Sequence, residues 1–352
     1  MSLVLFCFLG AFLLTYITLP RTIRITKRLG LVDTPDNRKS HSTRIPTMGG
    51  ISIFIGVLLI SLVGIPFGRY EEFSFILAAL IIVFLLGAVD DVDPILPITK
   101  LMGQMIAVLL IVVFADIRIS SLYGIFGIEM ISYEMSLLIS FMIFIFLINS
   151  FNLIDGINGL SSSITILVSS VLGVWFFMTG NLPYAVISAA VAGSSLAFLK
   201  FNITPARIFM GDTGSLVLGT ICAVLTVQFL ETSAHSTSFG VIGTAAPSIA
   251  LGILIVPVFD TTRVFFLRLL RGRSPFRPDK NHIHHLLIAA GFSHMQSTAV
   301  LLGVNVTFIM AAFHFQDLRP IIFFLISFST AIVLTQVLRI SILFRKRRIS
   351  TS

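Results

Sequence analysis

Long apolar runs alternate with short polar segments along the whole chain. A helix that crosses a bilayer needs about 20 apolar residues, and these runs are continuous rather than alternating, so they predict helices and not the strands of a membrane barrel. Eleven spans are expected, near residues 2–19, 48–66, 73–89, 101–115, 134–152, 159–178, 182–199, 214–230, 244–266, 296–314 and 320–343. We therefore predict an all-α polytopic membrane protein, with residues 1–352 forming a single domain.

Composition agrees with this prediction. Hydrophobic residues make up 56% of the chain and charged residues only 11%, whereas a soluble domain carries about 25% charged residues. Cys7 and Cys222 both lie inside apolar runs, which is typical of buried small side chains and not of a disulfide framework or a metal cluster. The net charge of +8 does not indicate nucleic-acid binding, because the basic residues border the predicted spans.

The distribution of positive charge predicts the orientation. No basic residue precedes the first apolar run, and four follow it, which indicates a retained first span with its N-terminus outside. The inner segments are then 20–47, 90–100, 153–158, 200–213, 267–295 and 344–352. Counting Arg263 and Arg339 as inner flanks, they hold 21 of the 24 Lys and Arg residues. The C-terminus and all the motifs described next would face the cytoplasm.

Acidic side chains gather at the inner ends of three predicted spans. Asp90, Asp91 and Asp93 close the third span, Asp155 follows the fifth, and Asp212 precedes the eighth. Carboxylates at a membrane boundary are costly unless they are hydrated, paired or bound to a metal. Mg²⁺ typically takes one or two carboxylates together with substrate phosphates. We therefore expect these groups to converge around a divalent cation.

Polar groups beside the acidic positions suggest further ligands. Asn149 and Asn152 lie three residues apart at the end of the fifth span, so they share a drifting helical face. Their amide oxygens suit a hard cation or a sugar nucleotide, although hydrogen bonding between helices is an equally common use of membrane Asn. Thr213 and Ser215 can cap the helix that begins after Asp212. That helix start would then offer free N–H groups to a phosphate.

Two inner loops carry basic side chains suited to phosphate. In the first loop, Arg38, Lys39 and His41 form a cluster that could meet a lipid phosphate, or could serve only as a topological signal. The long inner loop 267–295 could fold over a substrate at the membrane surface. Its candidate residues are Arg277, His282, His284 and His285. Zinc is a rival for the three histidines, but no Cys or Glu completes a zinc pattern there.

Five segments in this order, 33–50, 87–93, 149–160, 209–219 and 275–287, give the chain a family resemblance. It resembles the polyprenyl-phosphate N-acetylhexosamine-1-phosphate transferases, and the His-Ile-His-His stretch is similar to that of the WecA-like branch. The resemblance implies UDP-GlcNAc as donor and undecaprenyl phosphate as acceptor. Asn158 is a departure, because family members often have Asp at this position.

The resemblance also implies roles for the site residues. Asp212 would be the first ligand of Mg²⁺, for which Mn²⁺ could substitute, and Asn152 would supply a second oxygen. Asp90 and Asp91 would orient or deprotonate the lipid phosphate. Asp155 would contact the nucleotide or support the metal. Direct transfer and a two-step route through an aspartyl phosphate both stay open.

Location and partners follow from the same resemblance. It implies a multi-pass protein of the bacterial inner membrane, a possible homodimer, that starts a cell-envelope glycan such as O-antigen, common antigen or teichoic acid. The alternatives are another UDP-N-acetylhexosamine as donor, a noncatalytic scaffold, and a proton-coupled transporter, whose carboxylates would lie near the bilayer midplane. Only Asp260, beside Pro257, lies deeper within a span, where pairing with an arginine is one interpretation.

Overall fold

Helices account for nearly all of the regular structure. The computed structural model describes residues 1–33, 45–66, 70–235, 242–272 and 281–350. In these ranges ten helices are long and apolar enough to cross a membrane, and α2 (Gly50–Gly64) is a shorter apolar helix. These eleven helices coincide with the eleven predicted spans, so the helical membrane class is confirmed. Two compact units can be distinguished, one of residues 1–120 and 132–231, the other of residues 121–131 and 232–352.

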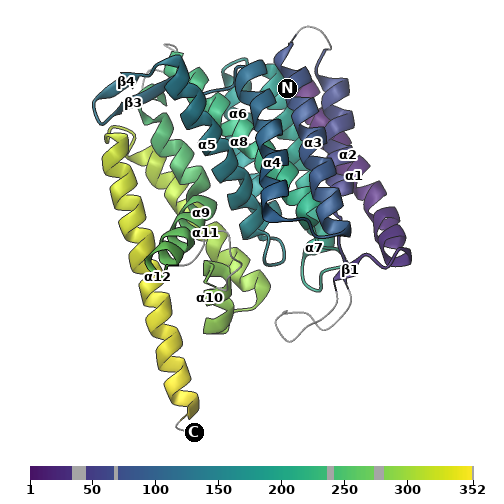
Figure 1. Ribbon diagram of the computed structural model, residues 1–352, viewed down its shortest axis with the longest axis vertical. Helices are drawn as coiled ribbons and strands as arrows, with labels where there is room; N and C mark the ends of the chain where they lie inside the picture. The colour runs from purple at the N-terminus through teal and green to yellow at the C-terminus, as the bar shows by residue number, and fades with distance from the viewer. Residues whose placement is uncertain (34–44, 67–69, 236–241, 273–280, 351–352) are drawn as a thin grey trace. The chain divides into compact units, whose positions relative to one another are not determined.

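The first unit contains the N-terminal helices (Figure 1). Besides α2, these are α1 (Ser2–Arg28), α3 (Glu72–Val92), α4 (Pro97–Leu109), the π-helical turn η1 (Leu110–Phe114), α5 (Tyr133–Ile154), α6 (Leu160–Met178), α7 (Leu182–Asn202) and α8 (Gly211–His235), which ends just beyond the unit. Helix α7 packs against α1, α2 and α6, and α3 packs against α4.

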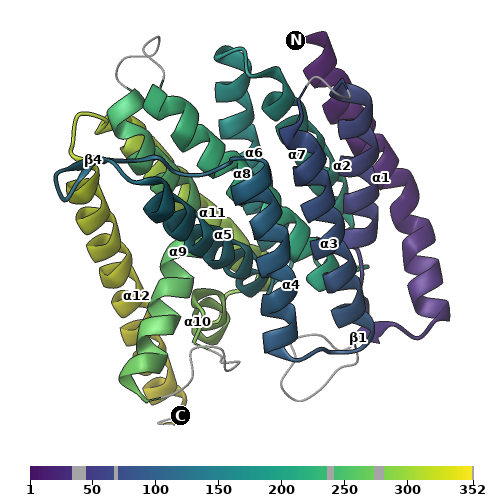
Figure 2. The ribbon, with the colours of Figure 1, turned by 45° about the horizontal axis from the view of Figure 1, so that its top comes forward.

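Hydroxyl groups join α1 to α2 inside the first unit. Thr22 Oγ1 and Ser52 Oγ lie 2.8 Å apart, and Thr15 Oγ1 donates to the Ser52 carbonyl at 3.3 Å. In a bilayer, apolar side chains gain little by leaving lipid, so close packing and such polar bonds hold helices together. The two helices lie side by side in both ribbon views (Figures 1 and 2).

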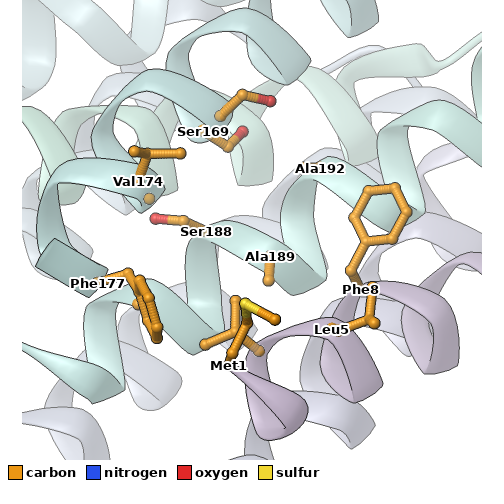
Figure 3. A pocket seen from close by; sticks show the side chains of 13 residues that line it. Met1, Leu5, Phe8, Ser169, Val174, Phe177, Ser188, Ala189 and Ala192 are labelled. Carbon is orange, nitrogen blue, oxygen red and sulfur yellow. The ribbon is translucent and has the colours of Figure 1, made fainter.

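An apolar cavity of about 310 Å³ lies between α1, α6 and α7 (Figure 3). Leu5, Phe8, Val174 and Phe177 are among its thirteen lining residues, none of which has an acidic or basic side chain. Ser188, also in the lining, has a buried hydroxyl without a hydrogen-bond partner. The lining side chains carry no acid or base, in contrast to the polar helix ends.

The second unit contains the C-terminal helices, in which α9 packs against α11 and α12. Its elements are β3 (Ser121–Ile125), β4 (Ile128–Met130), α9 (Ile242–Leu270), α10 (Ile283–Ala290), α11 (His294–His314) and α12 (Pro320–Ser350). A capping box starts α11: Ser293 Oγ accepts from the Gln296 amide, and the Gln296 side chain accepts from the Ser293 amide. This reciprocal pair satisfies two backbone donors that a helix start leaves open.

The inter-helix segments contain structure that the hydropathy pattern does not reveal. Strands β3 and β4 form an antiparallel hairpin between the fourth and fifth predicted spans. Strands β1 (Val32–Asp33) and β2 (Ile45–Pro46) pair in the first predicted inner loop, and α10 lies in the predicted inner loop 267–295. These elements are too short for a clear periodic signal, because the strands have two to five residues and α10 has eight.

A proline in α9 frees a carbonyl that another helix satisfies. Pro257 has no N–H, so the Ile253 carbonyl, four residues earlier, loses its helical partner. The fully buried Asn305 of α11 donates through Nδ2 to this carbonyl at 2.9 Å, and to that of Gly252 at 3.2 Å. With no water in the hydrocarbon core, a freed backbone group must find a protein partner. Asn305 therefore links α11 to α9 at the proline.

We expect Asn305→Leu to destabilise the protein by about 1–2 kcal/mol, because it leaves the Ile253 carbonyl buried without a donor. The measurement is thermal unfolding in detergent. Pro257→Ala restores a backbone donor to that carbonyl, so Asn305→Leu should cost less in the Pro257→Ala background than in the wild type. Equal costs in the two backgrounds would contradict this explanation.

Candidate active site

Four helix ends meet at one end of the first unit: the C-terminal ends of α3 and α5 and the N-terminal ends of α4 and α8. The ammonium of Lys100, on α4, bonds to Asp212 Oδ2 and lies 3.3 Å from Asp90 Oδ2. Asn152, at the end of α5, donates through Nδ2 to Asp212 Oδ1 at 2.8 Å. The structure thus brings three sequence-predicted site residues, Asp90, Asn152 and Asp212, around one lysine.

Asp91 holds the start of α8 in place. Its Oδ1 accepts the backbone N–H of Asp212 at 2.8 Å. Its Oδ2 accepts both the backbone N–H of Thr213, at 3.0 Å, and the Thr213 hydroxyl, at 2.5 Å. These two N–H groups are therefore bonded within the protein, and the expectation that they are free for a phosphate is wrong. A carboxylate from α3 takes that place, which suits the positive end of the helix dipole.

Two glycines permit this close approach. A Cβ on Gly87 of α3 would lie 2.6 Å from the carbonyl carbon and oxygen of Asp212, closer than real Cβ contacts occur. Gly211 has a φ of +74°, a left-handed conformation that L side chains rarely adopt, and a Cβ there would collide with the Asp91 carboxylate. The chain can bring α3 and α8 together because both positions lack a side chain.

Lys100 is the site residue to which the sequence analysis gave no role. Pro97 occupies the start of α4, which places Lys100 in the first turn of that helix. The positive end of a helix dipole disfavours a cation there, so its position needs compensating carboxylates. Asp90 and Asp212 supply them, and Asp90 Oδ1 also accepts the Ile95 N–H at 2.9 Å. The sequence did carry a sign of this role, because a lysine in the first turn of a helix, ten residues after Asp90, has a nearby carboxylate available as a partner.

Asn149 forms a bond between helices. Its Nδ2 donates to Gln104 Oε1 on α4 and to the Ile145 carbonyl, both at 2.8 Å. Gln104 is buried, and its Nε2 has no hydrogen-bond partner. These contacts agree with the interhelical alternative for Asn149 and link α4 to α5 next to Lys100.

The turn after α5 carries Asp155. Burial raises the pKa of this carboxyl well above its usual range, and the negative charge of Asp91 raises it further. In the same turn Asn158 donates through Nδ2 to Thr204 Oγ1 at 2.8 Å. Asn158 thus contributes a neutral bond to the segment before α8, and Asp155 is the acidic group of the turn.

Asp212 and Asn152 are the residues of this site that could hold a divalent cation. Asp212 offers carboxylate oxygens, whereas Asn152 turns its amide nitrogen toward Asp212 Oδ1, so its own oxygen would face a shared cation only with the amide turned over. The single ammonium of Lys100 does not offset the charges of Asp90, Asp91 and Asp212. No group of three or more His, Cys, Asp or Glu side chains able to hold a metal is found in the described part of the chain. Mg²⁺ commonly uses one or two carboxylates and completes its coordination with substrate phosphates, so a small protein donor set suffices.

The histidine stretch lies in the second unit. His282 precedes α10, and His284 and His285 lie in its first turn. His282 and His284 are buried, whereas His285 is half-buried. Burial, and to a smaller extent the neighbouring His285, lower the pKa of His284 to about 3, so the ring is neutral at physiological pH. The other predicted basic site residues, Arg38, Lys39, His41 and Arg277, lie outside the described residues.

Comparisons of the sequence with known proteins point to one family. The model of the family described as Glycosyl transferase family 4 matches residues 73–230, the segment from α3 to α8 that holds the clustered carboxylates. A Bacillus subtilis (strain 168) protein named probable undecaprenyl-phosphate N-acetylglucosaminyl 1-phosphate transferase is 34% identical over 312 residues, which are 87% of this chain and 83% of the relative. The undecaprenyl-phosphate alpha-N-acetylglucosaminyl 1-phosphate transferase of Escherichia coli (strain K12) is 30% identical over 307 residues, 83% of this chain and 78% of the relative.

We expect Gly87→Ala to destabilise the protein by about 1–3 kcal/mol, because the new methyl group collides with the backbone of Asp212 and must displace the start of α8. Gly303→Ala on α11 is the matched control, since its Cβ would meet nothing within 4 Å. Thermal unfolding of both variants in the same detergent tests this. Equal unfolding temperatures for the two variants would show that α3 and α8 are not in contact at Gly87.

Proposed function

The chain belongs to glycosyl transferase family 4, and within that family we propose that it transfers N-acetylglucosamine-1-phosphate from UDP-GlcNAc to undecaprenyl phosphate. In coarser terms it is a membrane polyprenyl-phosphate N-acetylhexosamine-1-phosphate transferase of cell-envelope glycan biosynthesis. The assignment of GlcNAc is supported by the names of the relatives, which all refer to this sugar.

One observation carries the proposed chemistry: the ammonium of Lys100 held between Asp90 and Asp212, beside the amide of Asn152. The reaction must bring a lipid phosphate against the diphosphate of a UDP-sugar, and two anions approach only where positive charge offsets their repulsion. Phosphoryl transfer depends mainly on such electrostatic stabilisation and on positioning. A cation poised between carboxylates at a helix end provides both.

The bonds made and broken are simple. An oxygen of the lipid phosphate attacks the β-phosphorus of UDP-GlcNAc, the bond from that phosphorus to the bridging oxygen breaks, and UMP leaves. The lipid then carries a diphosphate joined to the sugar. A phosphate monoester has its second pKa at about 6, so it is largely dianionic at neutral pH and needs no strong base. Asp90 therefore serves to orient the acceptor rather than to deprotonate it.

Asp212 and Asn152 are the residues that would hold Mg²⁺. When bound, Mg²⁺ would neutralise charge on the phosphates. Lys100 moves from its carboxylate partners to the β-phosphate oxygens as negative charge develops there. Asp91 does not reach substrate in this scheme, because both of its oxygens hold the start of α8 and so place Asp212.

The site lies on the cytoplasmic face in this proposal. The 21 to 3 distribution of Lys and Arg between the predicted inner and outer sides supports it, and so do the bacterial relatives. A proton-coupled transporter would carry its carboxylates near the bilayer midplane. Asp90, Asp91 and Asp212 instead lie in the last turn of α3 and the first turn of α8.

We expect the purified protein, given Mg²⁺, undecaprenyl phosphate and UDP-GlcNAc, to release UMP and form undecaprenyl-diphospho-GlcNAc. Mass spectrometry of the lipid and chromatography of the nucleotide measure the two products. A panel of UDP-N-acetylhexosamines, with UDP-glucose as a control, tests the donor. Faster turnover of another UDP-N-acetylhexosamine would replace GlcNAc and leave the reaction class in place, whereas no UMP from any donor would refute the transferase itself.

We expect Lys100→Gln to lower kcat at least about 100-fold, because it removes the positive charge that meets the β-phosphate. Lys200→Gln is the matched control: Lys200 also lies at a helix end, but it contacts the Tyr16 ring and hydroxyl instead of a carboxylate. UMP release under saturating substrates provides kcat. A Lys100→Gln enzyme as active as the Lys200→Gln enzyme would remove Lys100 from the reaction.

A further inference from the structure

One hydrogen bond joins α4 directly to α5, one helical turn away from the lysine of the site. Gln104 Oε1 on α4 accepts from Nδ2 of Asn149 on α5 at 2.8 Å. In the described part of the chain no other side-chain bond directly connects these two helices, which pack against each other (Figure 1). Gln104 follows Lys100 by four residues, and Asn149 precedes Asn152 by three. Residues three or four apart are neighbours on one face of a helix, so the bond lies one turn from both site residues.

A carboxylate forms a second connection between the same two helices. Oδ2 of Asp212, on α8, is bonded to the Lys100 ammonium of α4, and its Oδ1 accepts from Nδ2 of Asn152 of α5 at 2.8 Å. We call this bridge the carboxylate link, and the direct bond between Gln104 and Asn149 the amide link. The carboxylate link lies at the helix ends, and the amide link lies one turn further from those ends.

The two links differ in what the proposed reaction does to them. Lys100 leaves Asp212 when its ammonium meets the β-phosphate, so the carboxylate link opens during each turnover. The amide link contains no group that the reaction uses, and it then remains as the side-chain bond between α4 and α5. A lysine has a flexible four-carbon stem. The position of its ammonium after release therefore depends on how the helical turn that carries it is held.

Stability alone does not explain a glutamine at position 104. Its side chain is 1% exposed, and its Nε2 has no hydrogen-bond partner in the described part of the chain. A buried polar group without a partner is destabilising. A hydrogen bond between membrane helices stabilises them only a little, because the unfolded chain in the membrane also finds partners. An apolar side chain of similar size would avoid the unpaired group, so Gln104 is better explained by the geometry that it sets.

We propose that Gln104 is a positioning residue for Lys100: through Asn149 it holds α4 against α5 while Lys100 exchanges the carboxylate of Asp212 for the β-phosphate of the donor. This inference rests on the proposed function, since the exchange is a step of the proposed transfer. Gln104 acts through Lys100 and does not itself touch the substrate.

Steady-state kinetics of Gln104→Leu test the proposal. Its kcat should fall at least about tenfold while both KM values stay within about threefold, because the contact between Lys100 and the β-phosphate strengthens as the transition state forms. Gln336→Leu is the matched control, since the Gln336 side chain is exposed on α12 and makes no side-chain bond in the described part of the chain. Rates are expressed per folded enzyme, with thermal unfolding of both variants as the check. A kcat equal to that of the control would overturn the proposal.

An exchange of the two amide side chains separates the amide link from a simple loss of packing. Gln104→Asn and Asn149→Gln each change the reach of one side chain, and each alone should lower kcat at least about tenfold. The double variant moves one methylene from α4 to α5 and keeps both amides, so its kcat should return to within about threefold of the wild type. Effects that multiply in the double variant would mean that the two residues act independently, which contradicts the proposal. These variants also decide the matter if Gln104→Leu does not fold.

Chemical labelling of Lys100 needs no turnover. In the wild type its half-buried ammonium lies between Asp90 and Asp212, so an amine-reactive reagent should modify it slowly. Without the amide link α4 is held less firmly, and Gln104→Leu should be labelled at Lys100 at least about threefold faster, at one fixed pH and without substrates. The variant with exchanged amides should be labelled at the wild-type rate. Mass spectrometry measures the modification, and the exposed Lys200 is the internal reference.

This measurement separates the positioning role from the reaction itself. If the wild type forms no lipid product but Lys100 is labelled faster in Gln104→Leu, the proposed transfer fails and the positioning of Lys100 stands. If the labelling rate of Lys100 relative to Lys200 is the same in both proteins, the positioning role is refuted, whatever the wild type catalyses.

Discussion

The carboxylate of Asp91 on the start of α8 is the constraint on which the site depends. Inside a membrane protein, the first N–H groups of a helix have little water available, so another part of the chain must accept them. Asp91 does this from α3. Its three bonds to Asp212 and Thr213 place the Asp212 side chain where Lys100 and Asn152 can reach it. The arrangement of charged groups at these helix ends depends on this one cap.

In the second unit, too, side chains of one helix form hydrogen bonds with open backbone groups of another, at two places. Asp260 accepts the N–H of Ile283 at the start of α10, as Asp91 does for α8, and both caps come from a different helix than the one they stabilise. Asn305 donates to the carbonyl of Ile253, which Pro257 leaves without a helical donor. In each case a single polar side chain satisfies a backbone group and, in doing so, fixes one helix against another. Charged residues make up only 11% of this chain, and Asp91 and Asp260 are two of them that serve as caps between helices.

Sequence alone predicted the helices and the acidic positions well, because both depend on local features. Hydropathy located the eleven helices, and the rarity of charge made Asp90 and Asp212 conspicuous. What it could not predict were partnerships between distant segments: the capping role of Asp91, the place of Lys100 between two carboxylates, and the bonds of Asp260 to His282 and Ile283. A spacing along the chain does not tell which donor a carboxylate will meet, and the short strands and α10 gave too little periodicity to detect.

The close approach of α3 and α8 also limits how this protein can change over generations. A side chain at position 87 is tolerable only if the backbone at 212 retreats, and that backbone is tied to the carboxylate at position 91. Substitutions at position 87 and in the segment around position 212, more than a hundred residues away, are therefore expected to occur together. A lineage that replaced Gly87 would have to rebuild the other segment as well, so this pair of helix ends is inherited as one part.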